Sequence, residues 1–186
     1  MSLDIKEVAE KIKAGEVFAF QTDTVPGLSC DATNVDAIEK IAKLKNRPAE
    51  KQNFIVLVSN DRLMMKLVKE VPEMAWNLIE VSDKPLTVVL DDATDYLPDA
   101  VKGPNNSIAV RYVKEPVLKK LIDSVNKPIV STSANISGED NPTQISELNP
   151  EIAKEVTVWD NGLKGSGKAS SIFKIKVNGE FEILRK

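Results

Sequence analysis

Four short segments of this chain concentrate side chains that can bind anions, and each borders an apolar stretch. They cover residues 22–28, 45–48, 107–111 and 131–138. Together they supply hydroxyls, amides, lysines and arginines, with no obvious pair of catalytic carboxylates and no activated nucleophile. Ligands of open α/β sheets usually bind at strand ends. We therefore take these segments as candidate parts of an anion-binding site.

The first segment, residues 22–28, follows a short apolar stretch typical of a buried strand. Thr22, Thr24 and Gly27 can offer donors to a small polar ligand. The same composition also suits a polar turn in which threonine and glycine make only local hydrogen bonds. This segment alone does not separate the two interpretations.

Three cations lie close together near the predicted end of a helix: Lys45, Arg47 and Lys51. Arginine binds phosphate or carboxylate through a planar fork, and lysine does so as a point charge. Cations at this position can also simply complement the negative end of the helix dipole. The spacing is compatible with both roles.

Ser107 and Arg111 bracket an apolar stretch that is typical of a strand. Because they are four residues apart, strand alternation places both on the same face. The ordinary alternative for Arg111 is a solvated surface arginine.

Residues 131–138 are the segment richest in polar side chains, Ser131, Ser133 and Asn135 among them. The segment begins where a predicted buried strand ends and carries no charge, which favours function over a solvent loop. Two weaker signals are Ser171, which follows a glycine-bearing loop, and Arg185, at the end of the last predicted strand. The alternatives there are a plain loop and a terminal charge.

The composition excludes several kinds of chemistry. The 186 residues include no histidine and a single cysteine, Cys30, and the formal net charge is -3 at pH 7. Ser-His-Asp or Cys-His catalysis, a His-ligated zinc site and an intrachain disulfide are therefore excluded. The acidic balance does not favour non-specific nucleic-acid binding. The chain begins without an apolar signal core and has no run of about 18 apolar residues, so we expect a cytoplasmic protein without a membrane span.

The elements that must position these segments mix helices with strands. Apolar spacing predicts helices over residues 4–14, 33–44, 62–68, 72–81 and from 116, and strands over 17–21, 54–58, 86–90, 108–112, 129–131 and 156–159. Asn178-Gly179 between two apolar runs predicts a closing hairpin over residues 171–184. This pattern indicates a single α/β domain, residues 1–186, with a mixed sheet.

A site that binds anions without a nucleophile suits phosphoryl or nucleotidyl transfer, because that chemistry depends mainly on positioning and charge stabilisation. Mg²⁺ fits such a site when substrate phosphates hold it in place of a protein cage. We therefore expect no set of protein metal ligands.

Seven motifs follow one another along the chain: Thr22-x-Thr24-x-x-Gly27-Leu28, Lys45-x-Arg47-Pro48, Pro85-Leu86-Thr87, Val110-Arg111, Ser131-Thr132-Ser133-Ala134-Asn135-x-Ser137-Gly138, Ser170-Ser171-Ile172 and Ile183-Leu184-Arg185. Their shared order resembles the YrdC/TsaC family of threonylcarbamoyl-AMP synthases over nearly the whole chain. Each motif is weak by itself, and their order on one chain of this length is specific.

The resemblance implies a YrdC-like twisted mixed parallel/antiparallel sheet flanked by helices, with a concave, positively lined cavity. It implies that L-threonine, bicarbonate and ATP, with Mg²⁺ held mainly through the ATP phosphates, give threonylcarbamoyl-AMP and pyrophosphate. This reaction is the first step of threonylcarbamoyladenosine modification of tRNA. The partners implied are downstream threonylcarbamoyl-transfer proteins and, as an open question, tRNA or double-stranded RNA.

The resemblance also assigns roles to matching positions. The catalytic pair would be Lys45 and Arg47. The residues facing threonine would be Thr22, Thr24, Arg111, Ser131 and Ser171. The residues facing the nucleotide would be Lys51, Ser107, Ser133, Asn135, Asn141 and Arg185.

Three positions depart from the family pattern. Pro26 stands where the family usually has tyrosine, residues 83–85 read Asp-Lys-Pro in place of Pro-Gly-Pro, and residues 52–54 replace a Pro-Leu pair. These departures affect loop shape and leave the cations and hydroxyls in place. We also expect the extra C-terminal domain of longer members to be missing.

Two other functions stay open. One is a non-catalytic RNA-binding protein in tRNA or ribosome maturation, against which the acidic balance and the 5% aromatic content count. The other is a carbamoyl-adenylate-forming enzyme like the related domain of hydrogenase-maturation proteins, whose partner domains we do not expect here.

Overall fold

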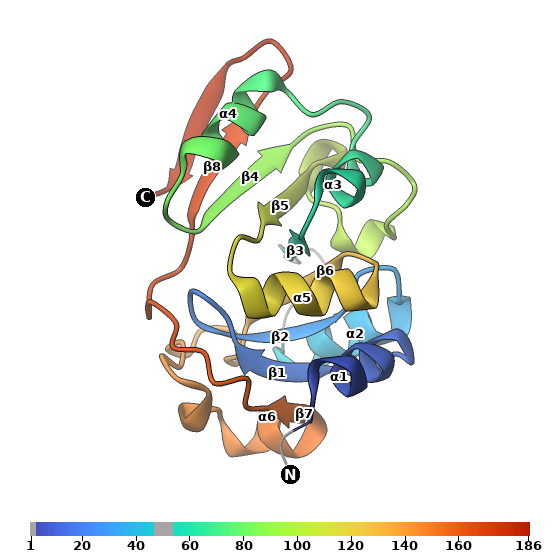
Figure 1. Cartoon of the computed structure of the whole chain (residues 1–186), viewed down its shortest axis with the longest axis vertical. Helices are drawn as coiled ribbons and strands as arrows, with labels where there is room; N and C mark the ends of the chain where they lie inside the picture. Colours follow the sequence, from blue (N-terminus) through green and yellow to red (C-terminus); the bar gives the residue numbers. More distant parts are fainter. Residues whose placement is uncertain (1–2, 47–53) are drawn as a thin grey trace.

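One mixed β-sheet organises the molecule (Figure 1). The computed structural model describes residues 3–46 and 54–186. Within them the strands are β1 (Phe18–Gln21), β2 (Pro26–Asp31), β3 (Ile55–Val58), β4 (Leu86–Leu90), β5 (Ile108–Tyr112), β6 (Ile129–Ser133), β7 (Thr157–Trp159), β8 (Ser171–Ile175) and β9 (Phe181–Arg185). Their order across the sheet is β7-β1-β2-β6-β3-β5-β4-β8-β9. The pairs β1/β7, β3/β5 and β4/β8 are parallel and the others antiparallel, which confirms the predicted mixed sheet.

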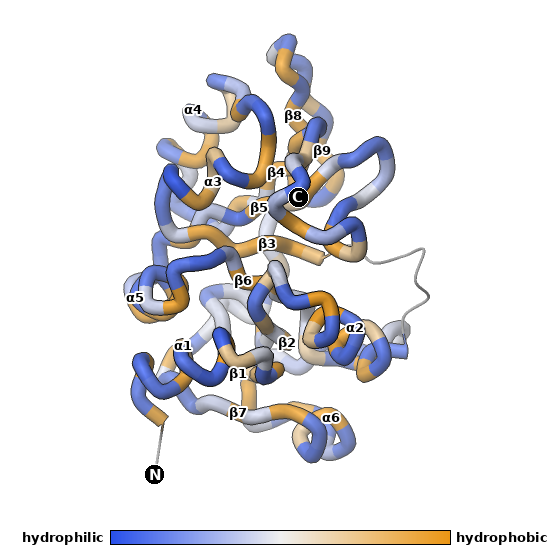
Figure 2. Tube along the Cα trace, turned by 90° about the vertical axis from the view of Figure 1, so that its right-hand side faces the viewer, coloured by the Kyte–Doolittle hydropathy of each residue, from blue (hydrophilic) through white to orange (hydrophobic). Residues whose placement is uncertain are grey.

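Helices cover both faces of this sheet. They are α1 (Ile5–Lys13), α2 (Val35–Leu44), α3 (Asp61–Leu67), α4 (Glu73–Val81), α5 (Pro116–Val125) and α6 (Pro150–Glu155). Figure 2 shows α1, α3, α4 and α5 on one side of the strands and α2 on the other. None of the helices in the described part of the chain is long and apolar enough to cross a membrane.

Local signals set the ends of several elements. Asp4 and Glu7 form the capping box that begins α1, and the Asn34 side chain caps α2. Asn126 takes a left-handed conformation where α5 ends. Gly179 has φ +83° in the hairpin between β8 and β9. These features confirm the predicted helix starts and the closing hairpin.

The core lies on both sides of the central strands. Phe18 and Phe20 of β1 are fully buried, and Phe20 packs edge-on against Trp159 of β7 with ring centroids 5.7 Å apart. The Trp159 Nε1 donates to the Leu3 carbonyl at 2.9 Å, which ties the N-terminal segment to this sheet edge. Burial of these aromatic side chains fixes the sheet edge formed by β1 and β7. The turn at residues 22–25 follows β1 directly.

The predicted polar loop over residues 22–28 is wrong from Pro26 onward. Residues Pro26–Asp31 form β2, every residue of which is buried, because β2 pairs with β1 on one side and β6 on the other. Proline is tolerated as the first strand residue, where a missing N–H costs no ladder bond. A Cβ on Gly27 would lie 2.6 Å from Ser131 Oγ, so glycine permits the close approach of β6. Helix α6 was not predicted either.

Cys30, in the middle of β2, provides a test of this burial. It has no exposed surface, and burial together with the nearby Asp31 raises the pKa of its thiol well above the usual range. Because the thiolate is the reactive form, we predict that a thiol reagent modifies Cys30 only in molecules that have unfolded. The modification rate should follow the unfolding equilibrium measured by circular dichroism across a urea series. Rapid modification of the native protein would contradict the buried position of β2.

Candidate active site

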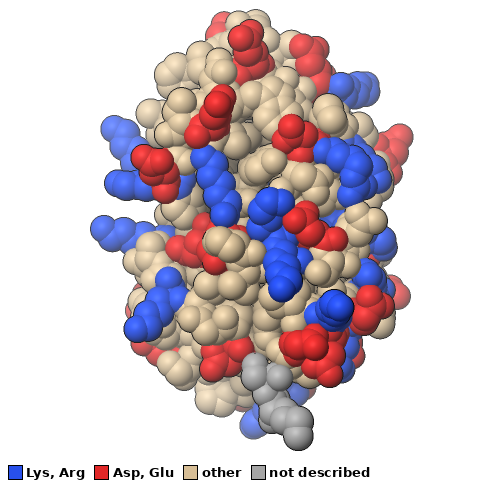
Figure 3. Space-filling view, in the orientation of Figure 1, with Lys and Arg blue, Asp and Glu red and all other residues tan. Residues whose placement is uncertain are grey.

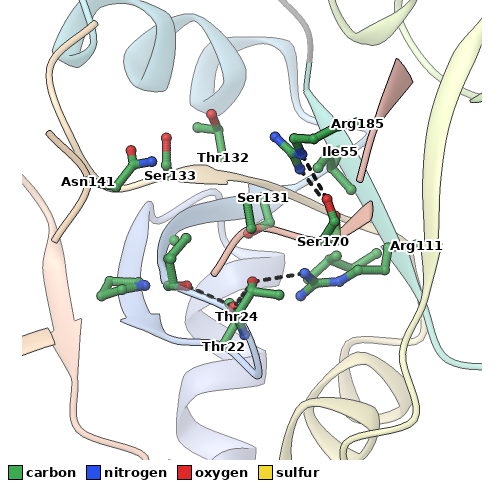
Figure 4. A pocket seen from close by; sticks show the side chains of 15 residues that line it. Thr22, Thr24, Ile55, Arg111, Ser131, Thr132, Ser133, Asn141, Ser170 and Arg185 are labelled. Carbon is green, nitrogen blue, oxygen red and sulfur yellow. Dashed lines mark hydrogen bonds between the residues drawn. The ribbon is translucent and has the colours of Figure 1, made fainter. Parts of the chain in front are cut away.

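A cavity of about 150 Å³ lies over strands β2, β3, β5 and β6 (Figure 4). Gly27, Ser131, Ile55, Leu57 and Arg111 line it from alternate strand positions, so one face of the sheet forms its floor. The remaining lining residues are Thr22, Thr24, Val25, Pro26, Thr132, Ser133, Asn141, Ala169, Ser170 and Arg185. The walls therefore come from segments far apart in the sequence.

Seven of the residues assigned from the sequence line this one cavity: Thr22, Thr24, Arg111, Ser131, Ser133, Asn141 and Arg185. Ser107 lines a larger neighbouring cavity of about 500 Å³, which shares Ile55 and Arg185 with the first. Strand alternation correctly placed Ser107 and Arg111 on one face, since both open onto this double cavity. Arg47 and Lys51 lie outside the described residues.

Arg111 is the most deeply buried charge of the cavity, with 4% of its surface exposed. Its Nη2 donates to Asp23 Oδ1 at 2.7 Å and its Nη1 donates to Thr24 Oγ1 at 3.0 Å. Burial lowers the pKa of the guanidinium, Asp23 opposes this effect, and Arg185 adds to it. The surface-arginine alternative is thus wrong, because Arg111 points into the molecule.

Thr22 and Thr24 continue this contact as a directional chain of hydrogen bonds. Thr22 Oγ1 lies 2.8 Å from the Val25 carbonyl, to which it donates, and 2.8 Å from Thr24 Oγ1. A hydroxyl has one proton, so Thr24 must donate to Thr22 and accept from Arg111. The chain runs Arg111 to Thr24 to Thr22 to the Val25 carbonyl, and it makes residues 22–25 a support for the guanidinium.

Arg185 and Ser170 form a second polar group in the wall. Arg185 Nε donates to the Ser170 carbonyl at 2.8 Å, and Ser170 Oγ lies 2.8 Å from Thr87 Oγ1. Burial lowers the pKa of the Arg185 guanidinium. The sequence had pointed to Ser171, whereas Ser170 is the serine of this pair that lines the cavity and Ser171 pairs with Leu86 in the sheet.

Lys45 supports the segment after β6. The residue is 2% exposed, and its Nζ donates to the Asn135 carbonyl at 2.8 Å and to Asn135 Oδ1 at 2.9 Å, with Ser133 also in contact. The Ser137 N–H in turn donates to the Lys45 carbonyl at 2.9 Å. The ammonium therefore holds residues 133–137 against the end of α2, and this network places Ser133 beside the cavity.

Two polar side chains of the cavity have no hydrogen-bond partner in the protein. Ser131 and Asn141 line the cavity, and no side-chain hydrogen bond joins them to any residue within 3–46 or 54–186. Figure 4 shows Ser131 between the arginines on one side and Ser133 and Asn141 on the other. A bound polar molecule would satisfy these groups, in contrast to Thr22 and Thr24, whose hydroxyls are already engaged.

The loop between β7 and β8 closes the site from outside. The N–H groups of Ser166 and Gly167 donate to the carbonyls of Asp23 and Thr24, each at 3.0 Å. A Cβ on Gly165 would lie 2.2 Å from the Thr24 carbonyl, so only glycine lets this loop pack on residues 22–24. In Figure 1 the same loop climbs from β7 toward β8, and it delivers Ser170 to Arg185.

Sequence reasoning missed several residues that line the cavity or lie next to it. Ser170 was next to the residue assigned, so its signal was present in the Ser-Ser pair. Ile55 and Leu57 were assigned to a buried strand, and only alternation relative to its neighbours reveals that they form the cavity floor. Asp23 lies inside the first motif, and its ion pair with Arg111 had no signal in the local sequence.

The cavity offers hydroxyl, amide and guanidinium groups in place of metal ligands. Across the described ranges there is no group of three or more His, Cys, Asp or Glu side chains that could hold a metal ion. The carboxylate next to the cavity, that of Asp23, is engaged by Arg111. Such a donor set favours binding anions through N–H and O–H groups.

Comparisons with known proteins agree with this geometry. The Sua5/YciO/YrdC family model, described as "Telomere recombination", matches residues 10–186. Threonylcarbamoyl-AMP synthase of Hydrogenovibrio crunogenus is 35% identical over 176 residues, which cover 92% of each chain. The same-named protein of Vibrio parahaemolyticus is 31% identical over 185 residues, 98% of each chain. A crystal structure of P. abyssi Sua5 complexed with L-threonine is similar at a TM-score of 0.84 and 29% identity, over 92% of this chain and 50% of that one.

The hydrogen-bond chain through Thr22 yields a stability prediction. Thr22→Val keeps the shape of the side chain but removes the hydroxyl that serves Val25 and Thr24, so we predict a loss of about 1–3 kcal/mol in the free energy of unfolding. Thr22→Ser keeps the hydroxyl and should lose much less. Urea denaturation of the two variants measures both values. Equal stability of Thr22→Val and the parent protein would show that the chain of bonds does not support the turn.

Proposed function

The chain belongs to the Sua5/YciO/YrdC family, and from this premise we propose that it is a threonylcarbamoyl-AMP synthase. It would convert L-threonine, bicarbonate and ATP to threonylcarbamoyl-AMP and pyrophosphate. The observation that carries this proposal is the cavity itself, where the buried Arg111 guanidinium, the more exposed Arg185 guanidinium and the unengaged side chains of Ser131 and Asn141 converge. Three substrates that each carry negative charge need such a set of donors.

For the amino acid we propose the part of the cavity around Arg111. Its floor of Ile55 and Leu57 can accept the methyl group of threonine, while the Ser131 hydroxyl and the arginines can bind the carboxylate. Thr22 and Thr24 would act mainly by holding Arg111 in place. The role assigned to Ser171 is better suited to Ser170, which reaches the cavity.

For the nucleotide we propose the adjoining space. Arg185 belongs to both cavities, and Ser107 lines the larger one together with apolar residues of β4, β5 and β8. That surface suits a purine ring, while Ser133 and Asn141 line the first cavity, which meets the larger one at Ile55 and Arg185. Asn135 would position Ser133, whose hydroxyl donates to Asn135 Oδ1. Arg47 and Lys51 remain proposed phosphate contacts.

The proposed chemistry joins three anions in two bond-forming steps. The threonine amine forms a C–N bond to the carbon of bicarbonate, with loss of water. An oxygen of the resulting carbamate forms a bond to the α-phosphorus of ATP, and the Pα–O bond to pyrophosphate breaks. The protein's part is to hold the reactants in line and to offset their charges. Arg111 would do so at the amino acid and Arg185 where the two cavities meet. In the proposed catalytic pair, Arg47 would act at the phosphates and Lys45, whose ammonium is bonded to Ser133 and Asn135, through its charge behind the wall.

Mg²⁺ belongs to the proposal as a companion of ATP. The residues around the cavity are hydroxyls, amides and cations, so the ion would be held by substrate phosphates, which is a common mode for Mg²⁺. It would offset charge on the phosphates during transfer. The reaction would take place in the cytoplasm, and the product would pass to proteins that transfer the threonylcarbamoyl group to tRNA.

The surface does not favour the RNA-binding alternative. On the face shown in Figure 3, lysines and arginines are interspersed with aspartates and glutamates. A backbone-binding surface would need a continuous basic patch. We therefore do not propose that this face binds tRNA.

The central experiment is a pyrophosphate-release assay. We predict release only when ATP, L-threonine, bicarbonate and Mg²⁺ are all present, with threonylcarbamoyl-AMP detected by mass spectrometry. Release that is indifferent to threonine would reject the proposed reaction. Release with carbamoyl phosphate in place of threonine and bicarbonate would indicate the carbamoyl-adenylate alternative.

Ser131 tests the proposed threonine site. Its hydroxyl has no hydrogen-bond partner within the described ranges, so Ser131→Ala should change the free energy of unfolding by less than about 0.5 kcal/mol. Loss of one substrate hydrogen bond should raise KM for threonine roughly tenfold. Ser124→Ala in α5, whose hydroxyl bonds the Lys120 carbonyl, is the control and should leave KM unchanged. An unchanged KM in Ser131→Ala would place threonine elsewhere.

A further inference from the structure

Few charges surround the deepest part of the cavity. The charged groups that act on Arg111 are the Asp23 carboxylate, which raises its pKa, and the Arg185 guanidinium, which lowers it. Arg111, Arg185 and Asp23 together carry a formal charge of +1, and the Lys45 ammonium lies apart from them, bonded to Ser133 and Asn135. A charge of this size matches one monocarboxylate.

Asp23 is held where it can set this charge. Its Oδ1 lies 2.7 Å from Arg111 Nη2, and its side chain is 21% exposed. Its backbone carbonyl accepts the Ser166 N–H at 3.0 Å, which pins the residue between the β1–β2 turn and the β7–β8 loop. Asp23 also lines a separate cavity of about 260 Å³. Asp23 therefore forms the partition behind Arg111 and does not itself line the cavity of the proposed substrates.

The proposed reaction explains why a carboxylate beside Arg111 would be needed. ATP and pyrophosphate bring phosphates into the same double cavity, and a phosphate dianion is attracted to paired guanidiniums more strongly than a carboxylate is. With Asp23 absent, Arg111 and Arg185 would present +2 to these phosphates. Specificity here requires a repulsive element against the wrong anion.

We propose that Asp23 is a specificity-determining residue: its carboxylate, paired with Arg111, tunes the part of the cavity around Arg111 to a monocarboxylate and against dianions such as phosphate. This inference rests on the proposed function for the identity of the ligand. Asp23 acts through Arg111, so it is a positioning and charge-setting group that need not touch the substrate.

Thermal stabilisation by acetate and by sulfate, at matched ionic strength and without ATP or threonine, tests the charge rule. We predict that Asp23→Asn shifts the ratio of apparent affinities toward sulfate by roughly tenfold or more, the scale on which an adjacent charge acts. Comparing variant with parent cancels any sulfate bound elsewhere. Asp23→Glu keeps the charge and should retain the parent ratio.

Asp31→Asn is the matched control. Asp31 is also buried and ion-paired, with Lys127 Nζ at 2.6 Å, but it lies at the far end of β2. The Asp31→Asn substitution should leave the ratio of acetate affinity to sulfate affinity unchanged. An unchanged ratio in Asp23→Asn, or a shift in Asp23→Glu equal to that in Asp23→Asn, would overturn the proposal.

A charge-compensated variant keeps the test valid if Asp23→Asn alone does not fold. Combining Asp23→Asn with Arg185→Gln restores the formal +1 and removes the repulsion between the arginines. The double variant should recover the acetate preference of the parent protein. A marked sulfate preference in the double variant would show that charge count does not set the selectivity.

Kinetics separate this inference from the function on which it rests. In the pyrophosphate assay, inorganic phosphate should compete with threonine roughly tenfold more strongly in Asp23→Asn, with kcat at saturating threonine changed less than KM. Inactivity of the parent protein would reject the proposed reaction and leave the acetate and sulfate result to stand by itself. An active parent with equal phosphate inhibition in both proteins would reject the role of Asp23 alone.

Discussion

The burial of the Arg111 guanidinium is the constraint around which the site is built. A charge removed from water is costly unless it is paired and hydrogen-bonded. Arg111 projects from β5, yet its partners Asp23 and Thr24 lie in the turn between β1 and β2, with β3 and β6 in between. The turn must therefore reach across the sheet to satisfy the charge. This contact joins the two halves of the molecule at the cavity.

The hydrogen bonds divide the polar residues of the site into two sets. Thr22, Thr24 and Lys45 are occupied by contacts within the protein and hold the walls. Ser131 and Asn141 have no such side-chain contacts in the described ranges and face the cavity. A rigid wall with a few unengaged donors is a preorganised site, in which the ordering of donors precedes ligand binding.

The departures from the family pattern affect the shape of the site more than its charges. Pro26 lines the cavity where the family usually has an aromatic ring, and its carbonyl still accepts the Ala134 N–H at 2.9 Å. The junction between β2 and the segment after β6 is thus intact without that ring. The cationic and hydroxyl groups, on which binding of anions depends, remain in place.

The sequence by itself determined most element types, with β2 and α6 as exceptions, most element ends and the chemical character of the site. Apolar periodicity and caps such as Asp4 and Asn34 are local signals, so they can be read from neighbouring residues. The absence of histidine restricted the chemistry before any fold was known. The order of the motifs identified the family resemblance that the comparisons then supported.

Only the tertiary structure decided which side chains meet. Residues 26–28 are part of a strand because β6 offers a second pairing partner. Ser170, and not Ser171, lines the cavity because the path of the loop from β7 determines which serine reaches it. The Asp23–Arg111 pair joins residues 88 positions apart. Such contacts depend on strand order and on the desolvation of a charge, and neither quantity exists within a local stretch of sequence.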